Sequence, residues 1–176
     1  MPIPYTTLFR SGWQLRYADQ LLMGKIYVVP IDGLASVPMF AEMGPDALEV
    51  SEEEFRERIK KHSGAIKNIL TNHKFVAGIG NAYSDEILWA ARLAPFRKRA
   101  SLAPDEVDAL YEAMRSVLGW AIAELRGLVP PRLEVEQRDF LKVHRKGGQA
   151  CSRCGTRLSE VSAGGFVTSF CRGCQR

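Results

Sequence analysis

The 176-residue sequence contains no run of the roughly 18 consecutive apolar residues that a membrane-spanning helix needs. Residues 1–12 also lack the basic start, apolar stretch and small-residue cleavage site of a secretory signal. No internal repeat is visible. The content of 46% apolar and 25% charged residues is that of an ordinary globular protein, which excludes a fibrous or disordered chain. We therefore expect a cytoplasmic protein without membrane contact, built as one domain with a small satellite or as two small domains.

Acidic residues are scarce in the last part of the chain. Residues 137–176 carry eight Lys and Arg against two acidic residues, a net charge of +6, whereas the remainder has a net charge of −2. A basic end on a nearly neutral body favours an anionic polymer as partner, because clustered cations gain free energy when they release counterions from phosphates. A solubilising tail is the alternative interpretation.

Short β-prone runs near the amino terminus predict a hairpin. Residues 13–17 (WQLRY) and 25–29 (KIYVV) are rich in aromatic and β-branched residues, and residues 19–24 between them are interpreted as the turn. Residues 1–12 have no readable period. Because two strands alone are marginally stable in water, the hairpin resembles a remnant of a larger sheet. Residues 31–50, punctuated by glycine and proline, are interpreted as a connector.

Four helices are predicted in the middle of the chain. Ser51 and Glu54 form the pattern of a capping box at the start of the first helix, with the Ser51 hydroxyl and the Glu54 carboxylate serving free backbone amides. Pro104 suits the first turn of the longest helix, in which apolar residues follow the helical period as far as Leu125. The expected ranges are 51–62, 65–72, 81–93 and 104–125.

The four cysteines of the chain form two C-x2-C pairs separated by sixteen residues: Cys151, Cys154, Cys171 and Cys174. Two such pairs can complete a tetrahedral four-sulfur shell with bonds of about 2.3 Å, which is a zinc geometry. A closed shell leaves no position for water, so we predict one structural Zn²⁺ in a hairpin of residues 155–170 that turns at residues 163–165. Two disulfides are the alternative, which a reducing compartment disfavours, and iron in the same cage is another.

A glycine turn (GIGN, residues 78–81) precedes the third predicted helix. Gly78 and Gly80 leave room for a phosphate near the backbone, and the first-turn amides and the helix dipole add positive potential. Asn81 can cap the helix or donate its side-chain amide to a phosphate oxygen. An ordinary tight turn with an asparagine cap explains the same residues. The nearby Lys67 and Lys74 favour the phosphate interpretation.

Two blocks of this sequence resemble one family closely. Residues 78–86 (GIGNAYSDE), preceded by Ile66-Lys67, and residues 168–175 (TSFCRGCQ) resemble the formamidopyrimidine-DNA glycosylase and endonuclease VIII family of base-excision repair enzymes. The resemblance implies a mainly α fold with small β parts. After an unpatterned start (1–12) it implies a remnant of the amino-terminal β-sandwich with its connector (13–43), a helix-two-turn-helix domain (44–136) and a four-cysteine zinc finger (137–176).

The resemblance also implies a partner and the positions that bind it. The partner is double-stranded DNA with abasic sites or oxidised bases such as formamidopyrimidines and 8-oxoguanine, bound by a monomer associated with the nucleoid. By position, Asn81 matches a phosphate-contacting asparagine, Lys67 a lysine near the damaged nucleotide, and Glu86 a carboxylate that faces the active-site cleft. Gly78 and Gly80 belong to the same DNA-binding turn. A solvated lysine and an ordinary surface acid are the alternatives for Lys67 and Glu86.

The amino terminus departs from the family pattern. The family's nucleophile is the secondary amine of an amino-terminal proline, which is followed by glutamate. Here Pro2 is followed by Ile3, so we interpret Pro2 as coincidental and assign no catalytic residue. The family usually places an arginine and a bulky residue where this chain has Leu22 and Met23, whose apolar side chains can still act as a wedge in DNA.

The finger departs from the family pattern at one residue. The family's phosphate-gripping arginine lies two residues before the threonine that Thr168 matches, and this chain has Phe166 there. A bidentate phosphate contact is therefore lost. Arg157 and Arg172 are the candidates to replace it, and both are expected to contact DNA.

Three functional hypotheses remain. The first is the damaged-DNA-binding portion of a glycosylase and AP lyase without most of its catalytic domain, which would be inactive alone. The second is a non-catalytic, zinc-dependent DNA-binding module. The third is a zinc-ribbon module that binds RNA or protein.

Overall fold

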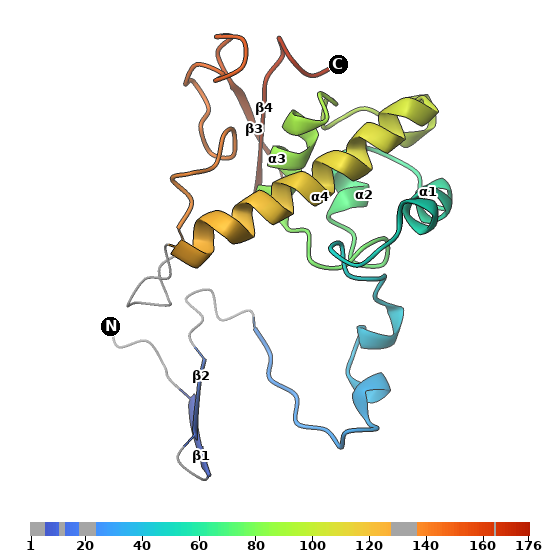
Figure 1. Ribbon diagram of the computed structural model, residues 1–176, viewed down its shortest axis with the longest axis vertical. Coiled ribbons are helices and arrows are strands. Elements are labelled where there is room, and N and C mark those ends of the chain that lie inside the picture. Colours follow the sequence, from blue (N-terminus) through green and yellow to red (C-terminus); the bar gives the residue numbers. More distant parts are fainter. Residues whose placement is uncertain (1–5, 11–12, 18–23, 128–136, 164) are drawn as a thin grey trace.

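The computed structural model describes residues 6–10, 13–17, 24–127, 137–163 and 165–176 (Figure 1). It consists of a helical body, a hairpin finger packed against that body, and a separate amino-terminal hairpin joined to the body by a long connector (Figure 1). This agrees with the predicted fold class, mainly α with small β parts. Within the described residues, no helix is both long enough and apolar enough to cross a membrane.

The amino-terminal hairpin differs from the prediction. Strand β2 (Trp13–Tyr17) forms as expected, but its partner is β1 (Thr6–Arg10), with Leu8 opposite Leu15. Residues 25–29 form no regular secondary structure. Residues 6–10, in which the sequence shows no readable period, form a strand. Only the dipeptide Ser11-Gly12 separates the two paired runs, and closing so short a connection costs little chain entropy. Pro2, Leu22, Met23 and most of the predicted turn lie outside the described residues.

The four predicted helices are confirmed, and three of them contain fewer residues than predicted. Ser51 caps the first helix, since its Oγ accepts a hydrogen bond from the Glu54 amide at 3.2 Å. The reciprocal half of the capping box is replaced by an ion pair between the Glu54 carboxylate and Arg58. The observed helices are α1 (Glu52–Lys60), α2 (Ile66–Leu70), α3 (Asn81–Ala90) and α4 (Pro104–Gly127), with short 3₁₀ helices at Leu34–Ser36, Phe40–Glu42 and Arg99–Ser101.

The core of the body lies between α4 and the three shorter helices. The Phe55 ring packs at 5.0 Å from Phe75 and 5.5 Å from Tyr111, measured between centroids. Side chains on one face of α4, including Leu110 and Met114, complete the cluster. The apolar stripe predicted on the longest helix is therefore core as far as Ala121, whereas Ile122 near its end is exposed.

Helix α3 ends one turn earlier than predicted because a residue adopts a left-handed conformation. Arg92 has φ of 60°, the Arg92 amide donates to Trp89, and the Leu93 amide donates to Leu88 at 3.0 Å. This is the Schellman arrangement that satisfies the last carbonyls of a helix. It turns the chain so that Leu93 is buried, and it directs α3 against the finger.

The finger is a hairpin of β3 (Ser159–Ala163) and β4 (Phe166–Phe170), as the cysteine spacing predicted. Its buried core is small and consists of Val143, Cys151, Leu158 and Cys171, with Trp89 of α3 packed against it. Strand β4 lies beside α3 (Figure 1). So small a core indicates that apolar burial alone does not hold the finger together.

Candidate metal centre and nucleic-acid interface

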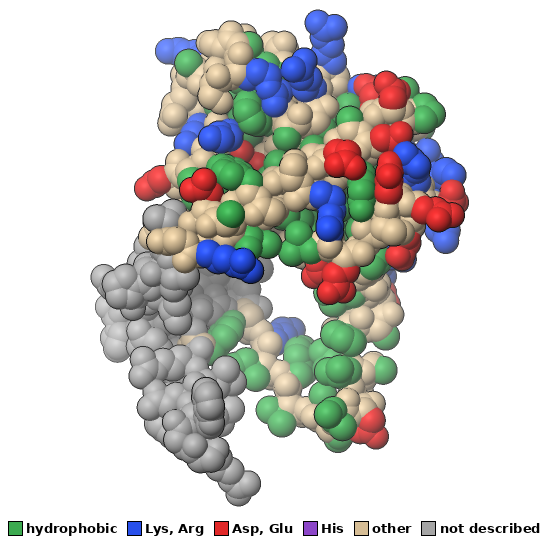
Figure 2. All heavy atoms as spheres, in the orientation of Figure 1, with side chains coloured by type: hydrophobic (Ala, Val, Ile, Leu, Met, Phe, Trp, Pro, Cys, Tyr) green, Lys and Arg blue, Asp and Glu red, His purple; other side chains and the backbone are tan. Residues whose placement is uncertain are grey.

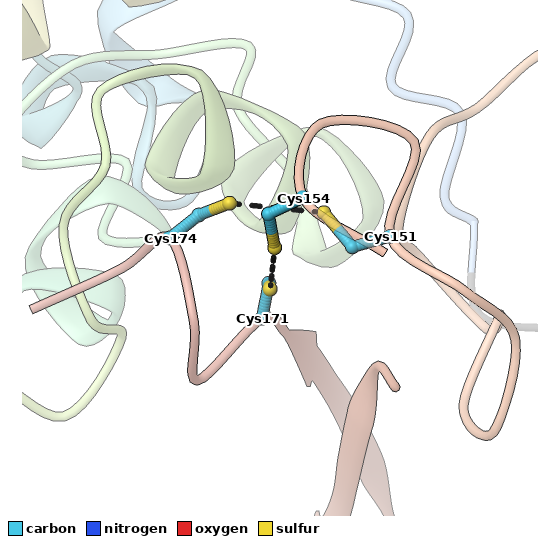
Figure 3. A group of neighbouring side chains, drawn as sticks. All are labelled: Cys151, Cys154, Cys171 and Cys174. Carbon is cyan, nitrogen blue, oxygen red and sulfur yellow. Dashed lines mark hydrogen bonds between the residues drawn. The ribbon is translucent and has the colours of Figure 1, made fainter. Parts of the chain in front are cut away.

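The four cysteine sulfurs converge on one point between the two C-x2-C turns, residues 151–154 and 171–174 (Figure 3). All four Sγ atoms lie within 4.8 Å of one another, with 3.8 Å between Cys151 and Cys174 and 3.5 Å between Cys154 and Cys171. A tetrahedral ion with bonds of about 2.3 Å requires sulfur–sulfur edges of about 3.8 Å, whereas a disulfide requires about 2.05 Å. The cage therefore fits a single four-coordinate metal ion, and the four cysteines are free.

Hydrogen bonds and burial act in opposite directions on the thiols of the cage. Trp89 of α3 donates its indole N–H to Cys151 Sγ at 3.4 Å. Hydrogen bonds from Thr156, and secondly from Cys174, lower the pKa of Cys154 to about 6, whereas burial raises the pKa of Cys171 and of Cys174. A Cβ added at Gly173 would lie 2.4 Å from Thr156 Oγ1 and 3.2 Å from Cys154 Sγ. The second C-x2-C turn therefore requires glycine at this position. These contacts favour an ion that binds sulfur.

A groove of about 630 Å³ lies between the helical body and the finger. Its body side includes Lys67 of α2 and Gly80 and Asn81 at the start of α3, and its finger side includes Phe166 and Thr168 of β4. The structure thus brings three of the seven predicted DNA-binding residues, Lys67, Gly80 and Asn81, to one place. Arg157 and Arg172 are exposed on the finger but do not line this groove.

Lys67 and Asn81 both bind the finger strand rather than solvent. The Lys67 ammonium donates to Thr168 Oγ1 at 2.8 Å and to the Val167 carbonyl at 3.2 Å. The Asn81 amide donates to the same Val167 carbonyl at 2.8 Å. Asn81 is the first residue of α3 and Gly80 is its N-cap, so the alternative in which Asn81 caps the helix is wrong. Both side chains join the body to the finger and form the floor of the groove.

A buried ionic network lies behind this floor. Asp85 accepts from the Lys67 ammonium at 2.6 Å with one oxygen, and its other oxygen contacts the Ser169 amide at 3.0 Å and His144 Nδ1 at 2.8 Å. The Asp85 side chain is fully buried and that of Lys67 is 8% exposed. Lys67 is therefore not a solvated lysine, and Asp85 is the residue that holds α2, α3 and β4 together.

The resemblance implied that Glu86 faces the active-site cleft, but Glu86 does not line the groove between body and finger, and it is not a surface acid. It is 1% exposed, and its carboxylate accepts the backbone amides of Lys142, Val143 and His144 at 2.8 to 2.9 Å. With its oxygens used in this way, Glu86 fixes the chain that enters the finger. The prediction of Glu86 as a DNA contact is corrected to a structural role.

The two glycines of the turn differ in their requirements. Gly78 has φ of 96°, a left-handed conformation that favours glycine. Gly80 has an extended backbone with φ of −100°, and a Cβ placed on it would meet no atom within 4 Å. The fold therefore requires glycine at position 78 but leaves open space above Gly80, on the groove side of the α3 tip.

Sequence reasoning missed Asp85, His144 and Ser169 of the buried network. Asp85 follows Lys67 by 18 positions and precedes the Ser169 amide by 84, so no helical or strand period connects them. Their only signal in the sequence is that Asp85 stands beside Glu86 on an otherwise uncharged helix. Burial of two adjacent carboxylates implies partners from other segments.

Comparisons with known proteins agree with this geometry. The formamidopyrimidine-DNA glycosylase H2TH domain matches residues 43–129. An uncharacterised formamidopyrimidine-DNA glycosylase-like protein of Mycobacterium tuberculosis is 39% identical over 142 residues, which cover 81% of this chain and 90% of that protein. The formamidopyrimidine-DNA glycosylase of Pelotomaculum thermopropionicum is 32% identical over 173 residues, covering 94% of this chain and 63% of that enzyme.

Solved structures give the same result. The MutM (Fpg) protein of Thermus thermophilus superposes with a TM-score of 0.83 at 31% identity, covering 99% of this chain and 70% of that one. The Lactococcus lactis Fpg in complex with DNA containing an abasic site superposes with a TM-score of 0.80 at 29% identity, covering 93% and 62%. The chain thus spans nearly all of the short mycobacterial relative and about two thirds of the longer glycosylases.

Fold and groove together define a helix-two-turn-helix protein with a four-cysteine finger. This chain belongs to the formamidopyrimidine-DNA glycosylase family and corresponds to the carboxy-terminal region of its members.

Proposed function

We propose that this chain binds damaged double-stranded DNA in the groove between the helical body and the finger. One observation carries the proposal: Lys67 and Asn81 both hold the Val167 carbonyl, so the tip of α3 and strand β4 form a single surface. The first-turn amides of α3 and the space above Gly80 suit a phosphate. The related Lactococcus lactis protein is bound to DNA with an abasic site, which supports the same partner here.

Charge on the finger supports an anionic partner. Figure 2 shows Lys and Arg side chains gathered at the finger end of the molecule, whereas acidic and basic side chains are mixed around α1 and α4. The exposed finger cations include Arg145, Arg153, Arg157 and Arg172. Arg153 is held in place, because its guanidinium lies 4.0 Å from the Trp89 ring centroid and donates to the Trp89 carbonyl at 2.8 Å.

The ion in the cysteine cage is proposed to be one structural Zn²⁺, held by Cys151, Cys154, Cys171 and Cys174. The four-sulfur donor set and its tetrahedral spacing support zinc, and the closed shell supports a structural role. Association with the nucleoid follows from the proposed partner.

Oxidised bases are the proposed lesions of the complete activity, since related proteins are formamidopyrimidine-DNA glycosylases. A non-catalytic DNA-binding role is the second candidate. It is favoured by Phe166, which stands where the family has a phosphate-binding arginine, and by the short mycobacterial relative that aligns over 90% of its length.

We expect the 176-residue protein to bind an abasic-site duplex with an affinity that falls steeply with salt, by a log–log slope of about −0.9 for each phosphate neutralised. Fluorescence anisotropy over a salt series measures this slope. Structured RNA of equal length is the control competitor. Equal affinity for RNA, or no binding to the abasic duplex at low salt, would refute the proposed function.

Borohydride trapping separates the two candidates. The 176-residue protein is expected to give no covalent adduct with abasic DNA, because its sequence contains no Pro-Glu pair like the one that carries the family's nucleophile. Fused to the amino-terminal domain of a related glycosylase, the chain should form the adduct if it is part of a glycosylase. A fusion that binds DNA and traps nothing would favour the non-catalytic role.

Replacing the two glycines is expected to separate stability from binding. Gly78→Ala should lower the free energy of unfolding by about 1–2 kcal/mol, because alanine is strained in the left-handed conformation. Gly80→Ala should cost less, on the order of 0.5 kcal/mol, because glycine at the N-cap is moderately better than alanine. It should nevertheless weaken DNA binding by about 10- to 100-fold, because a methyl group displaces a phosphate from the α3 amides. Urea denaturation and anisotropy measure the two effects. Unchanged DNA affinity in a folded Gly80→Ala protein would exclude phosphate binding at this tip.

A further inference from the structure

The finger presents an apolar face to the groove. In the β3–β4 register, Ala163 lies opposite Phe166 and Val161 lies opposite Thr168, so these four side chains share one face of the hairpin. All four line the groove, and Phe166 is 65% exposed. From the body, Phe96 also lines the groove and packs edge-on against Phe170 with centroids 5.5 Å apart. Phe96, Val161 and Phe166 thus form an exposed apolar patch in one groove, which is typical of a ligand-binding surface.

The groove has little positive charge with which to hold a phosphate beside Phe166. Lys67 is the single Lys or Arg among the described residues that line it. Its ammonium is already paired with the buried Asp85 carboxylate at 2.6 Å. A phosphate placed against the Phe166 ring would lose water without gaining a cation, which is unfavourable. The ligand portion that contacts Phe166 is therefore uncharged and flat.

A nucleotide with an unpaired base meets both requirements. Its phosphate can lie at the α3 tip, above Gly80, while its base lies on the Phe166 ring, because both residues line the same groove. Aromatic side chains stack on any base, since every base has a π face. A base paired within an intact duplex is stacked on its neighbours and does not offer this face.

We infer that Phe166 forms a stacking site for an unpaired base and thereby adds to the discrimination between DNA with an extrahelical or single-stranded nucleotide and intact duplex. This inference rests on the proposed function and names the substrate class of the same groove. Where the family has an arginine that binds a phosphate, this chain has Phe166. The phosphate contact is thereby replaced by a contact with a base.

The test compares three labelled probes by anisotropy: a blunt duplex, the same duplex with one unpaired thymine, and single-stranded oligothymidylate. Phe166→Ala should weaken binding to the unpaired-thymine duplex and to oligothymidylate by about 5- to 150-fold, and should leave the blunt duplex within about twofold. Phe166→Tyr should retain the preference. Phe166→Arg should strengthen blunt-duplex binding and steepen its salt slope by about one phosphate contact.

Ile122→Ala is the matched control, because Ile122 is an exposed apolar residue of α4 that does not line the groove. Metal content and circular dichroism should be the same for all variants, since Phe166 is largely exposed. Equal effects of Phe166→Ala on all three probes, or none, would overturn the inference while the proposed function stands. A Phe166→Ala protein that changes only its oligomeric state would overturn it in favour of contact between copies. If the unaltered protein binds no probe, the proposed function itself fails.

Discussion

Removing the metal is expected to unfold the finger and abolish most DNA binding. The finger core contains four buried residues, of which two are cysteines of the cage, and a two-stranded hairpin is marginal by itself. Binding of a structural zinc ion contributes about 10–16 kcal/mol in small fingers, so nothing in this core can replace it. Cys171→Ser, or a chelator such as EDTA, should therefore remove strand signal in circular dichroism. DNA affinity should fall on the order of 100-fold, because the finger forms one wall of the groove.

Ser152→Ala is the control for the loss of the metal ion. Ser152 lies between Cys151 and Cys154, is exposed, and provides no ligand, so Ser152→Ala should retain one zinc per chain and normal binding. Metal analysis by mass spectrometry on freshly purified, reduced protein measures occupancy. Protein that contains no metal and still shows a folded finger would contradict the structural role of zinc. Stoichiometric iron would retain the cage and change only the identity of its ion.

Breaking the buried Lys67–Asp85 pair is expected to have the second largest effect. Asp85→Asn leaves the Lys67 ammonium buried without an anion and weakens the contacts of Asp85 with Ser169 and His144. Loss of one partner of a buried ion pair costs about 3–5 kcal/mol, which is a large part of the stability of a small domain. Urea denaturation followed by circular dichroism measures this loss.

A double-mutant cycle tests whether the pair itself is responsible. Lys67→Met with Asp85→Asn should be less destabilised than Asp85→Asn alone, since no unpaired charge remains in the interior. The exposed pair of Lys60 and Glu57 is the matched control, and Glu57→Gln should have no measurable effect on stability. If the effects of Lys67→Met and Asp85→Asn add within about 0.5 kcal/mol, the ion pair does not couple α2 to α3.

Function and stability are expected to respond differently in this cycle. Lys67→Met/Asp85→Asn restores much of the stability but not the hydrogen bonds from Lys67 to Thr168 and Val167. DNA binding should therefore stay weak in the double variant even where its folding recovers. This separates the role of the network in folding from its role in positioning β4 beside the α3 tip.

Local patterns in the sequence predicted the elements whose causes are local. The four helices begin at Ser51, Ala65, Gly80 and Pro104 or one residue later, since capping residues, glycine and proline act within a few positions. The cysteine spacing predicted both the cage and the hairpin between its pairs. The amino-terminal pairing was predicted wrongly. Residues 25–29 were predicted as the partner strand and residues 6–10 show no readable period, yet the nearer run, across a two-residue connection, forms the hairpin.

The sequence by itself determined the helical body, the four-sulfur cage and the residues of the α3 tip, because each depends on neighbours along the chain. The tertiary structure alone decided how the charged residues are used. It pairs Lys67 with Asp85, places three distant backbone amides on Glu86, and leaves Phe166 exposed in the groove. The physical reason is that burial and ion pairing depend on which segments meet in space, and residues 67, 85, 144 and 169 meet only after the finger has packed on α3.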